Sequence, residues 1–441
     1  MPKPIVAIVG RPNVGKSTLF NKIAGARISI VEDTPGVTRD RIYAAAEWSG
    51  REFTLIDTGG LEPETDDFML SSMLRQAEAA MESADVIVFL VDGRAGLLDT
   101  DREVALLLRK TKRPVILAVN KIDDMRREDL DTAEFYELGL GEPLAVSSGQ
   151  GLGLGDLLDE VARRFPKQAE AVEDEDVIKV AILGKPNVGK SSLVNKILGE
   201  ERVIVSDTPG TTRDAVDTPF ARDGQKYILI DTAGMRRKSK VTERIERYSV
   251  MRAVTAVERA DVCVIMVAAD EGISEQDSKI AGIAHERGKA CVIAVNKWDK
   301  IEKDDKTMNA FTADVNRELA FMPYAPKIFI SAKTGQRVLK MFELIHAAAQ
   351  NHAMRVATGV LNDVIVEATA MNQPPTDKGR SLKIFYATQA SVKPPTFVLF
   401  VNDANLMHFS YKRYLENQIR EAFGFAGTPI RFVIRNRGEK K

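Results

Sequence analysis

The same phosphate-binding signature occurs twice in this chain, first from Gly10 and again from Gly184, 174 residues later. Both copies fit G-x-x-x-x-G-K-[ST], a loop whose backbone N–H groups surround phosphate oxygens. One chance match is uncommon in a chain of this length, so two matches predict a duplicated phosphate-binding domain. The two loops consist of Gly10, Arg11, Pro12, Asn13, Val14, Gly15, Lys16 and Ser17, and of Gly184, Lys185, Pro186, Asn187, Val188, Gly189, Lys190 and Ser191.

Each loop lies between an apolar run typical of a buried parallel strand and a segment with the spacing of an amphipathic helix. The predicted strands are residues 5–9 and 178–183, and the predicted helices are residues 18–24 and 192–198. A loop in this position meets a helix N-terminus, where the helix dipole favours anions. We expect Lys16 and Lys190 to reach the β- and γ-phosphates, and Ser17 and Ser191 to offer hydroxyls to Mg²⁺.

A second element, N-K-x-D, follows a predicted buried strand in each half. The residues are Asn120, Lys121, Ile122 and Asp123, and Asn296, Lys297, Trp298 and Asp299. Open α/β sheets bind ligands at the carboxyl ends of their strands. An aspartate there can accept from both N1–H and the 2-amino group of guanine, whereas adenine would leave it unpaired. The nucleotide is therefore predicted to be GTP.

A third element, D-x-x-G, ends another predicted strand in each copy. The residues are Asp57, Thr58, Gly59 and Gly60, followed by Leu61, and Asp231, Thr232, Ala233 and Gly234, followed by Met235. Asp57 and Asp231 are suited to hold Mg²⁺ through water, and the glycine N–H groups can approach the γ-phosphate. Thr38 and Thr212 could close over the metal, although each threonine taken alone is also typical of a turn.

With a C-terminal block that includes residues 393–402 and 411–417, the tandem arrangement resembles the bacterial double-Era-like GTPases of the TrmE-Era-EngA-like family. The resemblance implies a cytoplasmic GTPase that acts in assembly of the large ribosomal subunit, with ribosomal particles and rRNA as partners. It also implies an S-A-x-x-G loop against the guanine. That loop begins with Ser331 and Ala332 in the second copy, and with Ser147 and Ser148 in the first.

The side chain that orients the attacking water in Ras-like enzymes is missing. Leu61 and Met235 stand where those enzymes have glutamine, so we expect slow hydrolysis. In Era-like relatives, an asparagine at the position of Asn13 and Asn187 resembles a K⁺ ligand, and a cation there would stabilise developing charge. The alternative is that both asparagines only shape the turn, which asparagine favours.

Composition and length predict a multidomain globular protein. The 441 residues are 44% hydrophobic and 28% charged, and no apolar run approaches a membrane span. We expect an α/β chain of two tandem P-loop G domains, each a mostly parallel sheet with helices on both faces, and then an α+β KH-like domain. The predicted boundaries are 1–165, an acidic linker at 166–176, 177–353 and 354–441. The free cysteines Cys263 and Cys291 are predicted to lie in buried strands, and the protein is expected to be monomeric.

Charge is distributed unevenly along the chain. Residues 1–165 carry 20 Lys and Arg against 28 Asp and Glu, whereas residues 354–441 carry 13 against 7. A positive C-terminal part suggests an anionic partner. The segment 235–240 after the second D-x-x-G element is strongly basic and could contact rRNA, or could be a solvated loop.

The C-terminal part is predicted to have the order helix, strand, strand, helix, strand, which resembles a KH-like domain. Gly424-Phe425-Ala426-Gly427 matches the G-x-x-G clamp of KH domains in letters, but a strand follows it instead of a helix. We therefore expect a helix-terminating turn. Whether this domain binds RNA or docks against the G domains stays open.

Three other functions fit these residues less well. A GTP-dependent tRNA-modification enzyme would need a cofactor domain and a nucleophilic cysteine, which neither predicted buried cysteine suits. A P-loop kinase or ATPase is disfavoured by both N-K-x-D elements. A scaffold with one inert G domain is disfavoured because both copies are complete.

Overall fold

The fold is taken from a computed structural model. It describes residues 3–25, 43–58, 69–124, 126, 131–166, 176–199, 204–205, 217–232, 246–302, 304, 306–374, 376–377 and 379–437.

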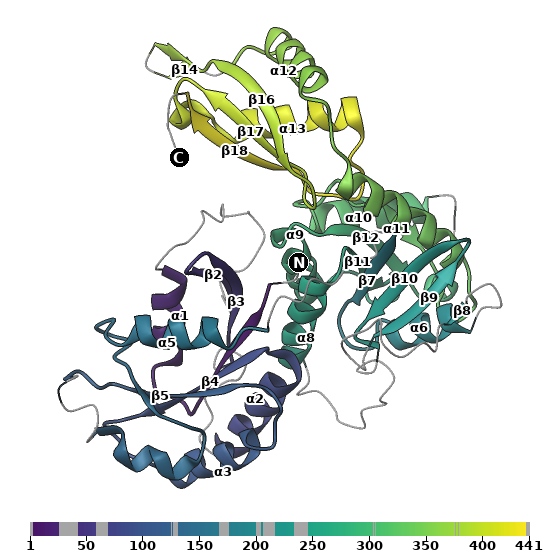
Figure 1. The fold of residues 1–441 in the computed structure, drawn as a ribbon. Helices are drawn as coiled ribbons and strands as arrows, with labels where there is room; N and C mark the ends of the chain where they lie inside the picture. The colour runs from purple at the N-terminus through teal and green to yellow at the C-terminus, as the bar shows by residue number, and fades with distance from the viewer. Residues whose placement is uncertain are drawn as a thin grey trace. The chain divides into compact units, whose positions relative to one another are not determined.

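The first sheet has six strands in the order β2-β3-β1-β4-β5-β6 (Figure 1). All neighbouring strands are parallel except β2, which pairs antiparallel with β3 at the edge. The strands are β1 (Ile5–Val9), β2 (Tyr43–Trp48), β3 (Arg51–Asp57), β4 (Val86–Asp92), β5 (Val115–Asn120) and β6 (Leu144–Ala145). β1 and β4 are buried along their whole length, as apolar runs between two helix layers should be.

Helices cover this sheet and complete its core. They are α1 (Lys16–Gly25), α2 (Met69–Ser83), α3 (Asp99–Leu108), the 3₁₀ helix η4 (Ala133–Leu138) and α5 (Leu154–Arg163). Leu19 and Phe20 of α1 and Leu157 of α5 pack with Val6 and Ile8 of β1 in one buried cluster. The central strand that leads into the phosphate loop is therefore packed into the core of the domain.

The second sheet repeats this arrangement with seven strands in the order β13-β12-β11-β7-β10-β9-β8. The strands are β7 (Val177–Leu183), β8 (Ile204–Val205), β9 (Thr218–Arg222), β10 (Gln225–Ile230), β11 (Val262–Ala268), β12 (Ala290–Asn296) and β13 (Lys327–Phe329). The helices are α6 (Lys190–Leu198), α8 (Glu246–Arg259), α9 (Glu275–Glu286), the 3₁₀ helix η5 (Trp298–Lys300), α10 (Thr307–Glu318) and α11 (Val338–Ala353). The fold class predicted from the sequence is confirmed.

Both phosphate-loop helices begin two residues earlier than the sequence pattern predicts. α1 begins at Lys16 and α6 at Lys190, not at residues 18 and 192. The apolar periodicity starts only after the lysine and serine, because these two residues belong to the polar first turn whose N–H groups face the loop.

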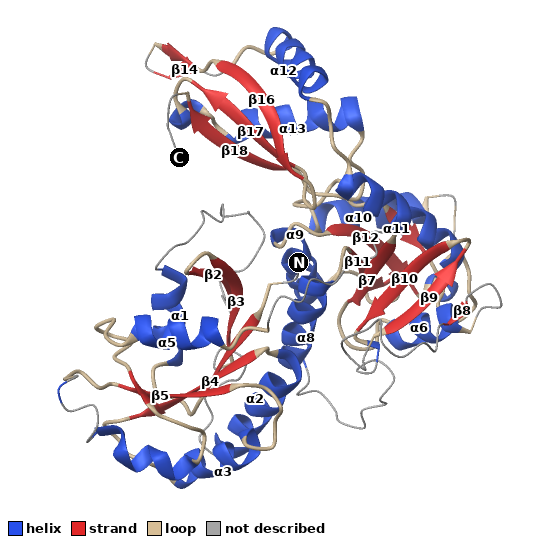
Figure 2. Ribbon diagram, in the orientation of Figure 1, coloured by secondary structure: helices blue, strands red, loops and turns tan. Residues whose placement is uncertain are grey.

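The C-terminal part has the predicted α-β-β-α-β order (Figure 2). The elements are α12 (Thr358–Met371), β16 (Ile384–Ser391), β17 (Thr396–Val401), the 3₁₀ helix η6 (Ala404–Leu406), α13 (Phe409–Phe423) and β18 (Arg431–Asn436). A short hairpin of β14 (Thr376–Asp377) and β15 (Arg380–Ser381), which the sequence did not predict, precedes β16. Tyr411, Leu415 and Ile419 of α13 are buried with the strands, as expected of a core stripe.

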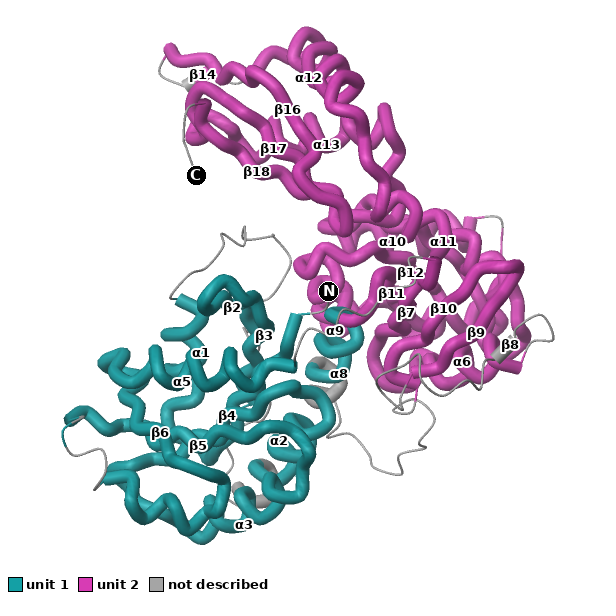
Figure 3. Tube along the Cα trace, viewed as in Figure 1, with its two compact units in different colours: residues 1–33, 38–173, 241–258 teal, residues 34–37, 174–240, 259–441 magenta. Residues whose placement is uncertain are grey.

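The chain divides into two compact units (Figure 3). Unit 1 comprises residues 1–33, 38–173 and 241–258, and unit 2 comprises residues 34–37, 174–240 and 259–441. Most of α8 thus groups with unit 1, where Thr54 donates a hydrogen bond of 2.7 Å to the buried Glu258.

Within unit 2, the turn Gly424–Gly427 joins the C-terminal part to the second sheet. α13 ends at Phe423, as the helix-terminating prediction requires. Gly427 O then accepts from Cys291 N at 2.7 Å, and Gly427 N donates to Tyr324 O at 2.8 Å. The turn therefore extends the hydrogen bonding at the start of β12.

Buried polar side chains surround this junction. His352 Nδ1 lies 2.7 Å from Thr428 Oγ1, and His285 Nδ1 lies 2.9 Å from the Tyr324 hydroxyl. Burial lowers the pKa of His285 to about 4 and the pKa of His352 to about 3. Cys263 and Cys291 form no disulfide and are buried in neighbouring strands, as predicted.

Candidate functional site

The first phosphate loop runs from the end of β1 to the start of α1, and its lysine lies inside it. Lys16 Nζ donates to Gly10 O at 2.6 Å and to Arg11 O at 2.8 Å. Burial lowers the pKa of Lys16 to about 8, and the negative charge of Asp57 opposes that shift. A cationic donor is thus held where the loop's N–H groups converge, as phosphate binding requires.

The second loop repeats this geometry. Lys190 Nζ donates to Gly184 O at 2.6 Å and to Lys185 O at 2.7 Å. Burial lowers the pKa of Lys190 to about 8, and the charge of Asp277 opposes the shift. The two loops therefore have the same internal geometry around their lysines.

The last loop glycine cannot be replaced without displacing its neighbours. Gly15 has φ +98°, and a Cβ there would lie 2.3 Å from Asn120 Nδ2. Gly189 has φ +102°, and its Cβ would lie 2.3 Å from Asn296 Nδ2. The glycine is needed for both the left-handed backbone and the close approach of the asparagine.

The asparagine of each N-K-x-D element ties the phosphate loop to the S-[AS]-x-x-G loop. Asn120 Nδ2 donates to Val14 O at 2.7 Å, while its Oδ1 accepts from Ser148 N at 2.9 Å. Asn296 Nδ2 donates to Val188 O at 2.7 Å, and its Oδ1 accepts from Ala332 N at 2.9 Å. A backbone N–H makes the second contact in both copies, and in the first copy the Ser148 hydroxyl donates a further hydrogen bond of 2.9 Å to the same Asn120 oxygen.

Each aspartate predicted to bind guanine is held by a serine of that loop. Ser147 Oγ donates to Asp123 Oδ1 at 2.6 Å, and the same kind of bond joins Ser331 to Asp299. The serine hydrogen bond is the main cause that lowers the pKa of Asp123 and of Asp299. Asp123 Oδ2 contacts Arg94. Both carboxylates are therefore ionised acceptors at neutral pH.

The lysines of these elements differ in their partners. Lys121 Nζ donates to Asn13 O at 2.8 Å and to Asp92 at 2.6 Å. Lys297 Nζ instead pairs with Glu271 at 2.9 Å and Asp270 at 3.1 Å. The following residues, Ile122 and Trp298, are buried and anchor the loops.

The first site has the donor set that Mg²⁺ prefers. Ser17 Oγ donates to Asp57 Oδ2 at 2.8 Å, so a hydroxyl and a carboxylate oxygen already adjoin at the loop. Oxygen ligands of this kind, together with phosphates and water, suit Mg²⁺. The residues present therefore fit the ion. In the second copy, Asp231 directly follows β10 and its N–H donates to the side chain of Asp217 at 3.1 Å.

Both candidate K⁺ ligands have left-handed backbones. Asn13 has φ +64° and Asn187 has φ +63°, and both side chains are exposed. This backbone agrees with the turn-shaping role of asparagine and does not conflict with a cation role.

The threonines of the two D-x-x-G elements are hydrogen-bonded within their domains. Thr58 Oγ1 donates to Ile8 O at 2.6 Å, and Thr232 Oγ1 lies 2.7 Å from Thr218 Oγ1.

Several predicted residues lie outside the described ranges: Thr38, Gly59, Gly60, Leu61, Thr212, Ala233, Gly234 and Met235. The basic segment 235–240 also lies outside them. Their roles stay predictions.

The sequence patterns did not reveal a buried carboxylate beneath each phosphate loop. Asp101 lies 3.5 Å from Arg11, and Asp277 lies 3.5 Å from Lys185. Both acids are fully buried at the third position of a helix, where Asp277 Oδ2 also accepts from Ser274 N at 2.9 Å. Aligning the two halves would have revealed the pair, because each acid occupies the same place relative to its N-K-x-D element.

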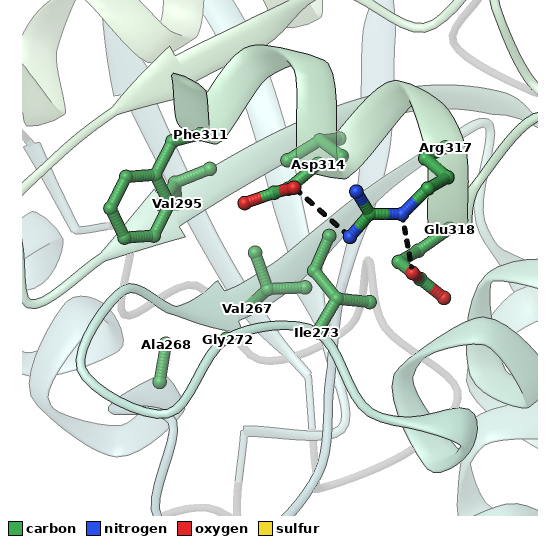
Figure 4. Close-up of a pocket in the computed structure, with 10 residues that line it drawn as sticks. Val267, Ala268, Gly272, Ile273, Val295, Phe311, Asp314, Arg317 and Glu318 are labelled. Atoms are coloured by element: carbon green, nitrogen blue, oxygen red, sulfur yellow. Dashed lines mark hydrogen bonds and ion pairs between the residues drawn. The ribbon is translucent and has the colours of Figure 1, made fainter. Parts of the chain in front are cut away.

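A cavity of about 230 Å³ lies in the second domain between α10 and the segment after β11 (Figure 4). Arg317 is one of the residues that line it and pairs with Asp314 at 3.0 Å and with Glu318 at 3.1 Å. None of its lining residues belongs to the four sequence elements described above. The cavity therefore uses none of the predicted nucleotide-binding residues, although Val295 directly precedes Asn296.

Two sites of this geometry, each at the carboxyl edge of a mostly parallel sheet, define a protein with tandem G domains. A family model described as "50S ribosome-binding GTPase" matches residues 5–121 and 179–297. A second model, "KH-domain-like of EngA bacterial GTPase enzymes, C-terminal", matches residues 355–435.

Curated relatives match the whole chain. Proteins named GTPase Der are 63% identical in Alkaliphilus metalliredigens and 62% identical in Acetivibrio thermocellus, each over 99% of both chains. The relative in Agathobacter rectalis is 60% identical over the full length of both. The chain belongs to the GTPase Der family.

Solved structures match parts of the chain. The FeoB G domain from Methanococcus jannaschii is 24% identical and covers 37% of this chain and 98% of its own, with a TM-score of 0.27. Within the described ranges, no helix has the length and apolar character needed to cross a membrane.

Proposed function

We propose that the protein is a GTP-hydrolysing switch that acts in assembly of the large ribosomal subunit, in the bacterial cytoplasm and as a monomer. The observation that carries this proposal is the duplicated guanine-reading pair, Asp123 with Ser147 and Asp299 with Ser331. The "50S ribosome-binding GTPase" description of the matching family model supports the ribosomal role.

Each site binds its nucleotide through the three loops described above. The phosphate loops hold the phosphates with Lys16 and Lys190, and the N-K-x-D aspartates read the base. Mg²⁺ would be held by Ser17 and Ser191, by Thr38 and Thr212, and through water by Asp57 and Asp231. The ion would supply positive charge to the β- and γ-phosphates.

Hydrolysis is slow and stimulated by K⁺. Leu61 and Met235 replace the water-orienting glutamine, and neither side chain can hydrogen-bond a water. Asn13 and Asn187 each place an exposed amide at the phosphate loop, where a K⁺ ion would offset charge in the transition state. Turnover measured in matched KCl and NaCl tests this role, and equal rates in the two salts would exclude it.

Cosedimentation with purified ribosomal subunits tests the ribosomal role. The wild-type protein should pellet with large subunits, and the bound fraction should differ between GDP and a non-hydrolysable GTP analogue. Small subunits serve as the matched control. Equal pelleting with both subunits, or none with either in any nucleotide state, would contradict the proposal. Competition by ATP at GTP-like concentrations would contradict the guanine assignment.

A further inference from the structure

The turn after β4 is held against the first N-K-x-D loop. Asp92 ends β4, and its carboxylate accepts from Arg94 N at 3.0 Å and from Lys121 Nζ at 2.6 Å. Gly93 N donates to Asn120 O at 2.9 Å. These three hydrogen bonds fix the backbone of Arg94 beside the loop that carries the aspartate predicted to read the base.

The side chain of Arg94 reaches that aspartate. Arg94 contacts Asp123 Oδ2, while Ser147 Oγ donates to Asp123 Oδ1 at 2.6 Å. The Arg94 side chain is 68% exposed and the Asp123 side chain is 31% exposed. An ion pair this exposed to solvent is weak, so a ligand that offers matching donors can replace the arginine.

Arginine and guanine offer the same kind of donor to a carboxylate. The guanine edge carries N1–H and a 2-amino group on neighbouring atoms of one plane, and a guanidinium group likewise presents a planar fork of N–H donors. Either group can bind a carboxylate through two parallel hydrogen bonds. Since bidentate reading of guanine uses both oxygens of Asp123, the base and Arg94 are alternative partners of Oδ2.

The second copy has the opposite charge at this place. Asp270 lies two residues after the end of β11, just as Arg94 lies two residues after the end of β4. The Asp270 carboxylate pairs with Lys297 at 3.1 Å and with Lys300 at 2.8 Å. An ionised carboxylate only accepts hydrogen bonds, so Asp270 cannot take the place of guanine at Asp299.

We propose that Arg94 competes with guanine for Asp123 and thereby sets the guanine affinity of the first site, whereas the second site has no such competitor at the equivalent position. The inference rests on the proposed guanine-reading role of Asp123 and adds regulation to that site. The base binds only the fraction of molecules in which Arg94 has left the carboxylate, so the arginine lowers the apparent affinity by that fraction.

Titration of the full-length protein with fluorescent GDP tests the proposal, with Asp299→Asn present in every protein to weaken the second site. Arg94→Ala should raise the GDP affinity of the first site about two- to fivefold, the range expected of an exposed ion pair. The gain should appear in the association rate, with the dissociation rate unchanged. It should also shrink as salt is added, because salt screens an exposed pair.

Arg163 is the matched control. Its side chain is 72% exposed and contacts the carboxylate of Glu160 in α5 of the same domain. Arg163→Ala should leave the GDP affinity of the first site unchanged. An equal gain in the two variants would overturn the proposal, as would wild-type affinity in Arg94→Ala. A loss of affinity in Arg94→Ala would also overturn it, since the arginine would then support the bound base.

Asp123→Asn separates this inference from the function on which it rests. If Asp123→Asn keeps the wild-type GDP affinity of the first site, the guanine-reading assignment itself fails. If Asp123→Asn weakens GDP binding and Arg94→Ala does not strengthen it, the assignment stands and only the competition fails. In a protein with Asp123→Asn and an unaltered second site, XDP reports the first site. Adding Arg94→Ala there should leave XDP affinity unchanged, because the charge that Arg94 contacts is already gone; a persisting gain would contradict the proposal.

Discussion

At the scale of single residues, a serine hydroxyl holds each aspartate that is predicted to read the base. One oxygen of Asp123 accepts from Ser147 and the other contacts Arg94, so both partners hold the carboxylate in a defined orientation. Asp299 and Ser331 form the equivalent pair. A preoriented acceptor loses less conformational freedom on binding, so we expect each serine to contribute to guanine affinity without touching the base.

Substituting the aspartates should change base preference. Asp123→Asn and Asp299→Asn replace an acceptor with an amide that can donate to the 2-oxo group of xanthine. Each variant should bind GDP about 10- to 100-fold more weakly in its own domain and gain affinity for XDP. Calorimetric titration with both nucleotides resolves the two sites. Wild-type GDP affinity in the altered domain would show that another group reads the base.

At the scale of elements, the first turns of α3 and α9 each contact a phosphate loop through a buried aspartate. Asp101 and Asp277 each cap their helix and face the basic residue that follows the first loop glycine. Burial raises the pKa of Asp101, and the charge of Arg11 opposes the rise. Helix and loop are thus joined by a buried ion pair in each copy, and in the second copy Lys185 also pairs with Glu271 at 3.1 Å.

Asp101→Asn should weaken nucleotide binding in the first domain only. The substitution leaves Arg11 buried without a counter-charge, at a cost of about 1–3 kcal/mol, part of which appears as reduced affinity. Asp99→Asn, on the exposed side of the same turn, is the control. The affinity of the first site can be measured by titration with fluorescent GDP in a protein that also carries Asp299→Asn, because that substitution is expected to weaken GDP binding in the second domain. Equal GDP affinities for the two variants would show that Asp101 caps α3 but does not contribute to nucleotide binding.

The Gly424–Gly427 turn offers a second comparison between matched positions. Gly424 and Gly427 have φ +90° and +79°, so alanine is strained at both. A Cβ at Gly427 would lie 2.6 Å from the Ala348 Cβ of α11, whereas nothing lies within 4 Å of one at Gly424. Gly427→Ala should therefore destabilise unit 2 by about 1–3 kcal/mol more than Gly424→Ala. Equal urea midpoints for the two variants would show that the contact with α11 can relax without a cost in stability.

At the scale of the whole molecule, unit 2 joins two differently folded sheets through a buried polar junction. His285 and His352 are uncharged there, next to arginines and lysines that include Arg420, Arg431 and Lys289. Since both folded-state pKa values lie below the ordinary value of 6.5, the unfolded chain binds more protons at acid pH. The stability that this contributes is complete above pH 6.5 and is lost as pH falls towards 4.

Unit 2 should therefore be acid-sensitive. At about pH 5, each histidine should cost about 2 kcal/mol relative to neutral pH. Trp48→Phe leaves Trp298 as the single tryptophan, so urea unfolding of the second domain can be followed by fluorescence. His352→Gln should remove about half of the pH dependence. If the stability of that variant depended on pH as strongly as that of the wild-type protein, His352 would not be a source of the acid sensitivity.

The sequence predicted those parts of the fold that depend on neighbouring residues. Strand, glycine loop and helix follow one another along the chain, so the strand–loop–helix units that carry both predicted phosphate sites could be located from local patterns. The contacts of Asp101 with Arg11 and of Gly427 with Cys291 join residues far apart in sequence, and no local pattern encodes them. The letters G-x-x-G in fact mark a contact within unit 2.

The hydrogen bonds of the two N-K-x-D asparagines have a consequence for engineering the two halves of the chain. Asn120 and Asn296 each connect a phosphate loop to a base-reading loop through one amide group. A graft of one loop alone would leave that amide with a mismatched partner. The three loops therefore have to be exchanged together if a chimera is to keep both contacts of each asparagine.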